Sequence, residues 1–270
     1  MFSRHSVSND ASQKRQLARS LAARIGEDRM KTVGTLDDLK REYGRLKLSD
    51  DMSVADSKYD CVTQVSMPEP LRHHEHHQKD EPAPEEVWMG PWGEIPRWKR
   101  GSTINYTAYL RGYLHPSHAY YAAHQLVQAA ERWNKMDIGI QFKWVDKLDD
   151  AAFALAYGAD GGSTLCKGFF PNSRDLNTLF VYQRAFKAGF VNNMENMFLH
   201  ELGHILGLRH EFANQLNDRM PWGSSNPYSV MSYSFPQQIQ DSDVKDTKAF
   251  YDFSNDRLGP YRIVDITPEN

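Results

Sequence analysis

Three histidines and a glutamate stand at fixed intervals in the run HELGHILGLRHE, which begins at His200. A helix advances about 100° per residue, so His200 and His204 lie one turn apart on one face and can hold one cation together. Glu201 falls beside this pair. Gly207 can adopt a left-handed conformation that ends the helix and turns the chain back, which makes His210 a third ligand. The run predicts a helix ending at about Gly207 and a catalytic zinc site with an open fourth position.

The carboxylate of Glu201 gives this site a chemical role. One zinc ion held by three neutral imidazoles keeps a water molecule and lowers the pKa of that water towards about 7. Glu201 can take the proton of the water as a general base and then give it to the leaving amine as a general acid. The sequence therefore predicts a zinc-dependent endopeptidase that hydrolyses peptide bonds. The alternative is a catalytically silent, zinc-containing module that binds peptides without cutting them.

Composition excludes several other classes of protein. With 270 residues and 40% hydrophobic content, the chain can bury one full core and carry an appendage. A net charge of −3 gives no electrostatic reason to bind nucleic acid or an anionic membrane. No apolar run is long enough to span a bilayer, and the N-terminus lacks the apolar stretch of a secretory signal. Only two cysteines occur, Cys61 and Cys166, so we expect buried free thiols and no disulfide framework.

Two regions are expected along the chain, an N-terminal extension at 1–93 and a catalytic domain at 94–270. Two amphipathic helices are predicted in the extension, the second capped by Thr35. Their apolar faces carry Leu17, Leu21 and Ile25 in the first helix and Leu36, Leu39, Tyr43 and Leu46 in the second. These helices either dock on the main domain or form a cleavable or flexible extension. Residues 50–93, rich in proline and charge, are typical of a linker, and their run HHEHH is interpreted as solvated.

Apolar periodicity after Trp98 predicts a mixed α and β domain. Strands are predicted at 104–110, 138–144, 153–157 and 179–182, an exposed edge strand at 163–170, and a buried helix at 119–133. An edge strand can pair with an extended peptide through its backbone, which offers a place to hold a substrate. Asn192 and Glu195 are spaced as a capping box, so the helix of the zinc site is expected to begin there.

The run HELGHILGLRHE, followed by Ser-Val-Met-Ser-Tyr at 229–233, resembles the metzincin clan of zinc endopeptidases, in which a methionine turn lies beneath the metal. The pair His210-Glu211 is similar to the astacins, and the turn is similar to those of serralysins and astacins. GGSTLCKGFFP resembles the edge strand of matrixins, but Lys167 stands where matrixins usually have a histidine for a structural zinc. We therefore expect one catalytic zinc and no second one. The resemblance covers Trp98 to Tyr251 and favours a divergent astacin-like or matrixin-like branch.

This resemblance implies an α+β, metzincin-like zincin fold. Such a fold has a mixed, mostly parallel twisted sheet with an antiparallel edge strand, an active-site helix, and a small C-terminal subdomain with the methionine turn and a closing helix at 242–251. By the same resemblance, Tyr233 reaches the zinc at rest and then stabilises the oxyanion, or else it is a core tyrosine that supports the turn. Met231 is expected to pack under the ligands. Glu211 either ties down a mature N-terminus or pairs locally with Arg209.

The expected partner is a peptide or protein substrate, and the chain is expected to be monomeric. Clan resemblance implies export, whereas the missing signal segment argues for the cytosol. The extension raises a further hypothesis, because a Cys61 thiolate or the Asp60 carboxylate could bind the zinc and keep the enzyme latent. The residues around Cys61 lack the proline, arginine and glycine that frame such a cysteine in matrixins.

Overall fold

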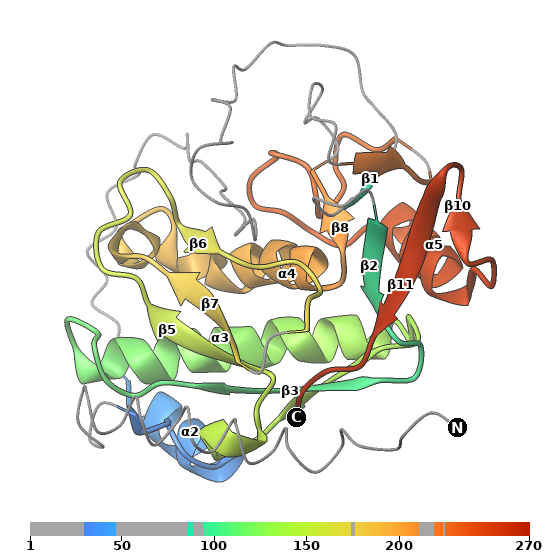
Figure 1. The fold of residues 1–270 in the computed structure, drawn as a ribbon. Helices are drawn as coiled ribbons and strands as arrows, with labels where there is room; N and C mark the ends of the chain where they lie inside the picture. The colour runs from blue at the N-terminus through green and yellow to red at the C-terminus, as the bar shows by residue number, and fades with distance from the viewer. Residues whose placement is uncertain (1–29, 47–85, 89–93, 174–175, 211–218, 224) are drawn as a thin grey trace, which may run out of the picture.

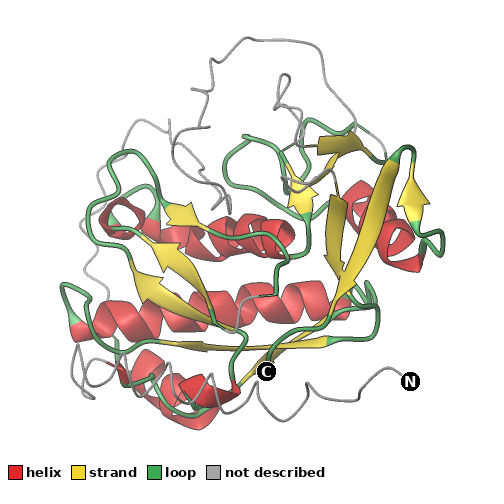
Figure 2. Cartoon of the chain, viewed as in Figure 1, coloured by secondary structure: helices red, strands yellow, loops and turns green. Residues whose placement is uncertain are grey.

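A five-stranded sheet and two long helices form the main body of the protein in a computed structural model (Figures 1 and 2), which describes residues 30–46, 86–88, 94–173, 176–210, 219–223 and 225–270. The sheet has the order β4-β3-β5-β7-β6, with β6 antiparallel to β7 and the other pairs parallel. Its strands are β3 (Thr103–Ala108), β4 (Gln141–Trp144), β5 (Phe153–Tyr157), β6 (Cys166–Lys167) and β7 (Asn177–Val181). This mixed α and β arrangement with a mostly parallel sheet agrees with the predicted class.

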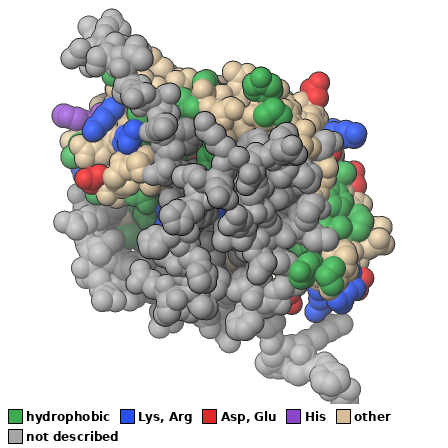
Figure 3. All heavy atoms as spheres, turned by 90° about the horizontal axis from the view of Figure 1, so that it is seen from above, with side chains coloured by type: hydrophobic (Ala, Val, Ile, Leu, Met, Phe, Trp, Pro, Cys, Tyr) green, Lys and Arg blue, Asp and Glu red, His purple; other side chains and the backbone are tan. Residues whose placement is uncertain are grey.

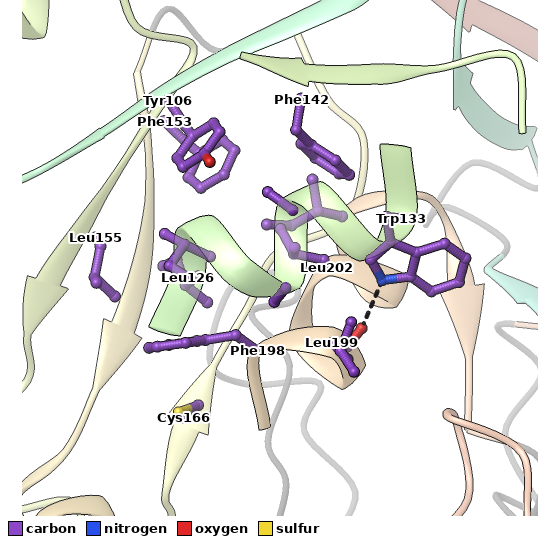
Figure 4. Close-up of a cluster of buried hydrophobic side chains, with 14 of the residues drawn as sticks. Tyr106, Leu126, Trp133, Phe142, Phe153, Leu155, Cys166, Phe198, Leu199 and Leu202 are labelled. Atoms are coloured by element: carbon purple, nitrogen blue, oxygen red, sulfur yellow. Dashed lines mark hydrogen bonds between the residues drawn. The ribbon is translucent and has the colours of Figure 1, made fainter. Parts of the chain in front are cut away.

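Helices α3 (Pro116–Lys135) and α4 (Met194–Ile205) pack on each other, with α3 against β3 and β4 and α4 against β6. Between the sheet and α4 lies a cluster of buried side chains that includes Leu126, Phe153 and Phe198 (Figure 4). The apolar stripe predicted on residues 119–133 is buried as expected. The strands predicted at 104–110, 153–157 and 179–182 are confirmed within one or two residues. The strand predicted at 138–144 begins only at Gln141.

Two small three-stranded sheets pair the segments β1 (Glu86–Trp88) and β2 (Glu94–Trp98), which precede the main sheet in sequence, with strands that follow α4. One has the order β8-β1-β9, with β1 between β8 (Leu208–Arg209) and β9 (Arg219–Pro221). The other has the order β10-β11-β2 and consists of β2, β10 (Arg257–Leu258) and β11 (Tyr261–Ile266). The closing helix α5 (Asp241–Asp252) lies where residues 242–251 were predicted to be helical. Short 3-10 turns occur at Leu148–Asp150, Gln183–Phe186 and Val191–Asn193.

The start of α4 differs from the prediction. A 3-10 turn at Val191–Asn193 precedes the helix, which begins at Met194, so Asn193 and not Asn192 takes the cap position. No side-chain cap bond forms there. Glu195 pairs instead with Arg132 of α3, whose Nη1 lies 3.1 Å from its Oε1. The predicted capping box was wrong because the carboxylate is used for contact between the two helices.

Buried donors from other elements fix the C-terminal half of α4. The indole N–H of Trp133 donates to the Leu199 carbonyl at 3.0 Å, and that of Trp98 donates to the Ile205 carbonyl at 2.6 Å. The Tyr251 hydroxyl of α5 donates to the Leu206 carbonyl at 2.9 Å. The last carbonyls of a helix have no partner within the helix, so the bonds to Ile205 and Leu206 satisfy buried groups and hold the helix end in place. The bond from Trp133 to Leu199 adds a contact in the middle of the helix.

The part of the N-terminal region at 30–46 docks on the main body. Helix α2 (Leu36–Gly44) is capped by Thr35 as predicted, and Leu39 is buried. The ring of Tyr43 stacks on His124 of α3, with centroids 3.6 Å apart, and the Trp144 indole N–H donates to the Gly34 carbonyl. Of the two alternatives for this helix, the structure therefore has the one in which it docks on the main domain. The helix predicted around Leu17, Leu21 and Ile25 and the linker histidines lie outside the described residues.

No helix among the described residues is long and apolar enough to cross a membrane. The described surface in Figure 3 carries acidic, basic and hydrophobic side chains in small separate patches.

Candidate metal centre

Helix α4 and strand β8 bring the three predicted histidines together. His200 and His204 lie one turn apart on α4 and are both buried. The helix ends at Ile205, and Gly207 has a φ of 93°, the left-handed conformation that was expected at this turn. β8 then runs back towards the helix and presents His210, which is also buried. Sequence spacing alone was sufficient to predict this convergence.

The Nε2 atoms of the three histidines form a triangle. The distances are 3.1 Å between His200 and His210, 3.2 Å between His200 and His204, and 3.0 Å between His204 and His210. A tetrahedral ion that binds nitrogen at 2.0–2.1 Å separates two ligand atoms by about 3.3 Å. The three histidines are therefore close enough to bind one metal ion. Among the described residues, they form the one such group of histidine, cysteine and carboxylate side chains.

Backbone carbonyls set the protonation of two of these rings. His200 Nδ1 lies 2.7 Å from the Val230 carbonyl oxygen, and His204 Nδ1 lies 2.9 Å from that of Leu208. A carbonyl can only accept, so each Nδ1 carries the proton and donates it, which leaves Nε2 as a free lone pair. Two lone pairs that face each other at 3.2 Å repel unless a cation lies between them. The tautomers therefore fit a metal ion.

Burial keeps all three imidazoles neutral, which is the form that binds metal. Loss of hydration lowers the pKa of His200 to about 4, although the bond to Val230 acts in the opposite direction. Loss of hydration also lowers the pKa of His204 and of His210 well below its usual value, and the neighbouring histidines add to the effect.

The carboxylate of Glu201 is held by the edge strand. Glu201 is buried, and its Oε2 accepts a hydrogen bond from the backbone N–H of Gly168. A Cβ at position 168 would lie 2.8 Å from this oxygen, so glycine permits the close approach. Since the N–H of Gly168 is donated to a side chain, it does not extend the ladder, and β6 ends at Lys167 although residues 163–170 were predicted to be a strand. The role of Gly168 was not predicted.

Met231 packs beneath the ligand helix, as expected. It is fully buried, and a Cβ at Gly203 would lie 2.3 Å from its sulfur. The turn around it is closed by a bond from the Met231 N–H to Ser229 Oγ at 3.0 Å. Gly203, which lies between Glu201 and His204, therefore leaves the space that the Met231 sulfur occupies.

Asp243 supports the same turn from α5. Its Oδ2 accepts from the Val230 N–H at 2.9 Å and from the Gln240 N–H at 2.7 Å. The carbonyl of Val230 in turn accepts from His200, so the carboxylate orients a ligand through one residue, Val230. The contact of Asp243 with this turn was not predicted from the sequence.

Tyr233 contacts the third ligand from its outer side. Its hydroxyl lies 3.0 Å from His210 Nδ1, so it can accept the proton of that nitrogen and give His210 the same tautomer as the other two ligands. This contact joins Tyr233 to the centre, while the role in stabilising an oxyanion stays a prediction.

The remaining candidates are divided between described and undescribed parts of the chain. Cys166 is a buried free thiol, as expected, and burial together with the Glu201 charge raises its pKa well above the usual value. Asp60, Cys61 and Glu211 lie outside the described residues.

No family model matches the chain, and no curated protein matches it.

Replacing Gly203 with alanine is expected to destabilise the metal-free protein by about 1–3 kcal/mol, because the new methyl group meets the buried Met231 sulfur. Urea denaturation in the presence of a chelator measures this change. Gly44→Ala is the matched control, since a Cβ there meets nothing within 4 Å. Equal stabilities of the two variants would contradict the packing of Met231 against α4.

Proposed function

We propose that this protein is a zinc-dependent endopeptidase with a metzincin-like catalytic domain. The observation that carries the proposal is the set of three convergent Nε2 atoms on neutral, oriented imidazoles next to a buried glutamate. Three histidines with a carboxylate that is not itself a ligand are typical of catalytic zinc, and imidazole ligands suit this ion. A wholly structural site would supply a fourth protein ligand, and among the described residues no such group joins the three histidines.

The arrangement of the other elements supports the metzincin resemblance. The antiparallel strand β6 lies at the edge of an otherwise parallel sheet, and α4 supplies two ligands. Met231 lies under the ligand helix, and α5 follows it and closes the domain. These features lie in the order expected for this clan.

Zinc bound at this centre would polarise a peptide carbonyl and lower the pKa of a coordinated water. Glu201 accepts the proton of the attacking water and then donates it to the leaving amine. The N–H of Gly168 holds the Glu201 carboxylate in one orientation, so that little reorganisation is needed during the reaction. The phenol of Tyr233 bonds to His210 Nδ1, on the side of the ring away from Nε2. To stabilise negative charge on the substrate oxygen it would have to swing towards the open position of the centre.

The edge strand offers a site for the substrate. β6 has β7 on one side, and its other edge has no strand among the described residues. A peptide bound in extended form can add to such an edge through main-chain hydrogen bonds. The segment that holds Glu201 would then also hold the substrate backbone, which supports an endopeptidase.

Metal analysis of the full chain, together with cleavage of a peptide library, tests the proposal. We expect one zinc per chain and peptide cleavage that stops with a chelator and returns with added zinc. A chain that binds zinc but cuts no peptide would be the silent peptide-binding module. A chain that binds no metal would contradict both functions.

Gly168→Ala is expected to lower kcat by about 10- to 100-fold, because the added methyl group displaces the Glu201 carboxylate from its position. Zinc content should be unchanged, since no ligand is touched. Steady-state kinetics and metal analysis measure the two effects, with Gly44→Ala as the control. A normal kcat would show that Gly168 does not orient the carboxylate.

A further inference from the structure

We propose that strand β1, which comes from the N-terminal region, is a positioning element of the metal centre. It is three residues long and lies at Glu86–Trp88, before the predicted start of the catalytic domain. Two of the three ligands depend on the strand that β1 pairs with. The inference rests on metal binding in the proposed function and not on peptide hydrolysis.

The pairing places β1 in the middle of its sheet (Figure 1). On one side Glu86 and Val87 pair with Arg209 and Leu208 of β8. On the other side β1 pairs antiparallel with β9 at Arg219–Pro221. β1 therefore pairs with the strands on both sides of residues 211–218. One is β8, which ends just before His210, and the other is β9.

The short strand β8 orients two ligands. The Leu208 carbonyl accepts the Nδ1 proton of His204 at 2.9 Å. His210 follows Arg209 directly, at the end of the same strand. A shift in the β8 backbone therefore moves the partner of one ligand and the Cα atom of another.

β8 has one packed face, with Leu208 in the core and Arg209 over the Phe170 ring, and its backbone also pairs with a neighbouring strand. It has two residues and lies at the edge of its sheet, where β1 is its neighbour among the described strands. It follows Gly207, whose left-handed conformation ends the helix and turns the chain. Short paired strands are marginal unless a further strand or a packed face supports them. Leu208 supplies the packed face, and the central strand β1, which pairs with both β8 and β9, supplies the further strand.

One consequence concerns the division of the chain. The boundary predicted after residue 93 falls between β1 and β2, and both strands pair with strands from the second region. The smallest unit with an intact metal centre therefore begins at or before Glu86. Removal of N-terminal residues past Trp88 is therefore expected to disrupt the centre.

Val87→Pro in the full chain tests the inference. Proline has no N–H and is not accommodated in a central strand, so it breaks the pairing of β1. Val87→Thr is the matched control, because threonine is β-branched and keeps the backbone donor. We expect the proline variant to bind zinc about 10- to 100-fold more weakly in competition with a chromophoric chelator, as for loss of groups that orient ligands. The threonine variant should stay within about twofold of the original protein, since its backbone pairing is kept.

Hydrogen exchange of the metal-free proteins gives a second measurement that does not depend on the ion. In the proline variant, amides of residues 208–210 should lose protection, while those of Leu206 and Gly207, which donate within α4, and those of β5 and β7 keep it. Equal zinc affinity with unchanged exchange would overturn the inference. Loss of protection throughout the main sheet would also overturn it, since β1 would then support the whole fold and not the centre. An original protein that binds no zinc would contradict the proposed function, while exchange at 208–210 would still decide the role of β1.

Discussion

Replacing Glu201 with glutamine is expected to lower kcat by about 10²- to 10⁴-fold while the protein keeps its metal. Glutamine has nearly the same size and can still accept the hydrogen bond from Gly168, so the edge strand and α4 should stay in place. An amide cannot take the proton of the attacking water or return it to the leaving amine. Steady-state kinetics on a peptide that the original protein cleaves, together with metal analysis, measures both quantities.

Glu195→Gln is the matched control for this experiment. Glu195 lies on the same helix, but its carboxylate is partly exposed and pairs with Arg132. Its loss should leave kcat within about twofold, because an exposed ion pair contributes little. An active Glu201→Gln variant would show that another group transfers the proton. A variant that has lost its zinc would show that Glu201 holds the centre together.

The ligands could be predicted from the sequence because their geometry is local. His200, His204 and His210 are placed by one helix and one glycine turn, whose shapes depend on spacing alone. The groups that orient them come from distant segments and are mostly backbone atoms. Almost every residue type has a main-chain carbonyl and N–H, so no sequence pattern marks the Val230 carbonyl or the Gly168 N–H as a partner of the centre.

The N-terminal region shows the same limit. The cap at Thr35 and the apolar face of α2 were predicted, since both follow from short-range spacing. Whether α2 docks depends on the surface of α3, where His124 meets Tyr43, and that surface is formed by tertiary packing. Strand β1 is three residues long and lies close to prolines and glycines, so it has no measurable periodicity. Its pairing with β8 could be found only in the structure.

The stability of the metal-free protein is expected to fall steeply as the pH drops below about 6.5. In the unfolded chain the ligand histidines have their ordinary pKa of about 6.5. In the folded protein burial lowers the pKa of His200 to about 4 and lowers the pKa of His204 and His210 as well. Between these values the unfolded chain binds protons that the folded chain does not, so acid favours unfolding. Above pH 6.5 both states are neutral at these sites and the effect is absent.

The expected size follows from proton linkage. Each buried histidine lowers the free energy of unfolding by about 1.4 kcal/mol for each pH unit below 6.5, so three histidines lower it by about 4 kcal/mol per pH unit. Domains are stable by about 5–15 kcal/mol, so one to two pH units are enough to remove much of this stability. The half-buried His118 and His124, whose pKa values burial also lowers, add a smaller contribution of the same sign. Urea denaturation with a chelator at pH 7.5, 6.5 and 5.5 measures the slope.

His200→Gln separates the ligand histidines from the rest of the chain in this measurement. It removes one of three buried titrating groups, so the slope below pH 6.5 should fall by about 1.4 kcal/mol per pH unit, whatever the variant does to stability at pH 7.5. The Gly44→Ala variant, which removes no titrating group, should keep the original slope. Stability that stays constant between pH 7.5 and 5.5 would mean that the three imidazoles are accessible to protons in the folded chain. The neutral, oriented ligand set from which zinc binding is inferred would then not exist.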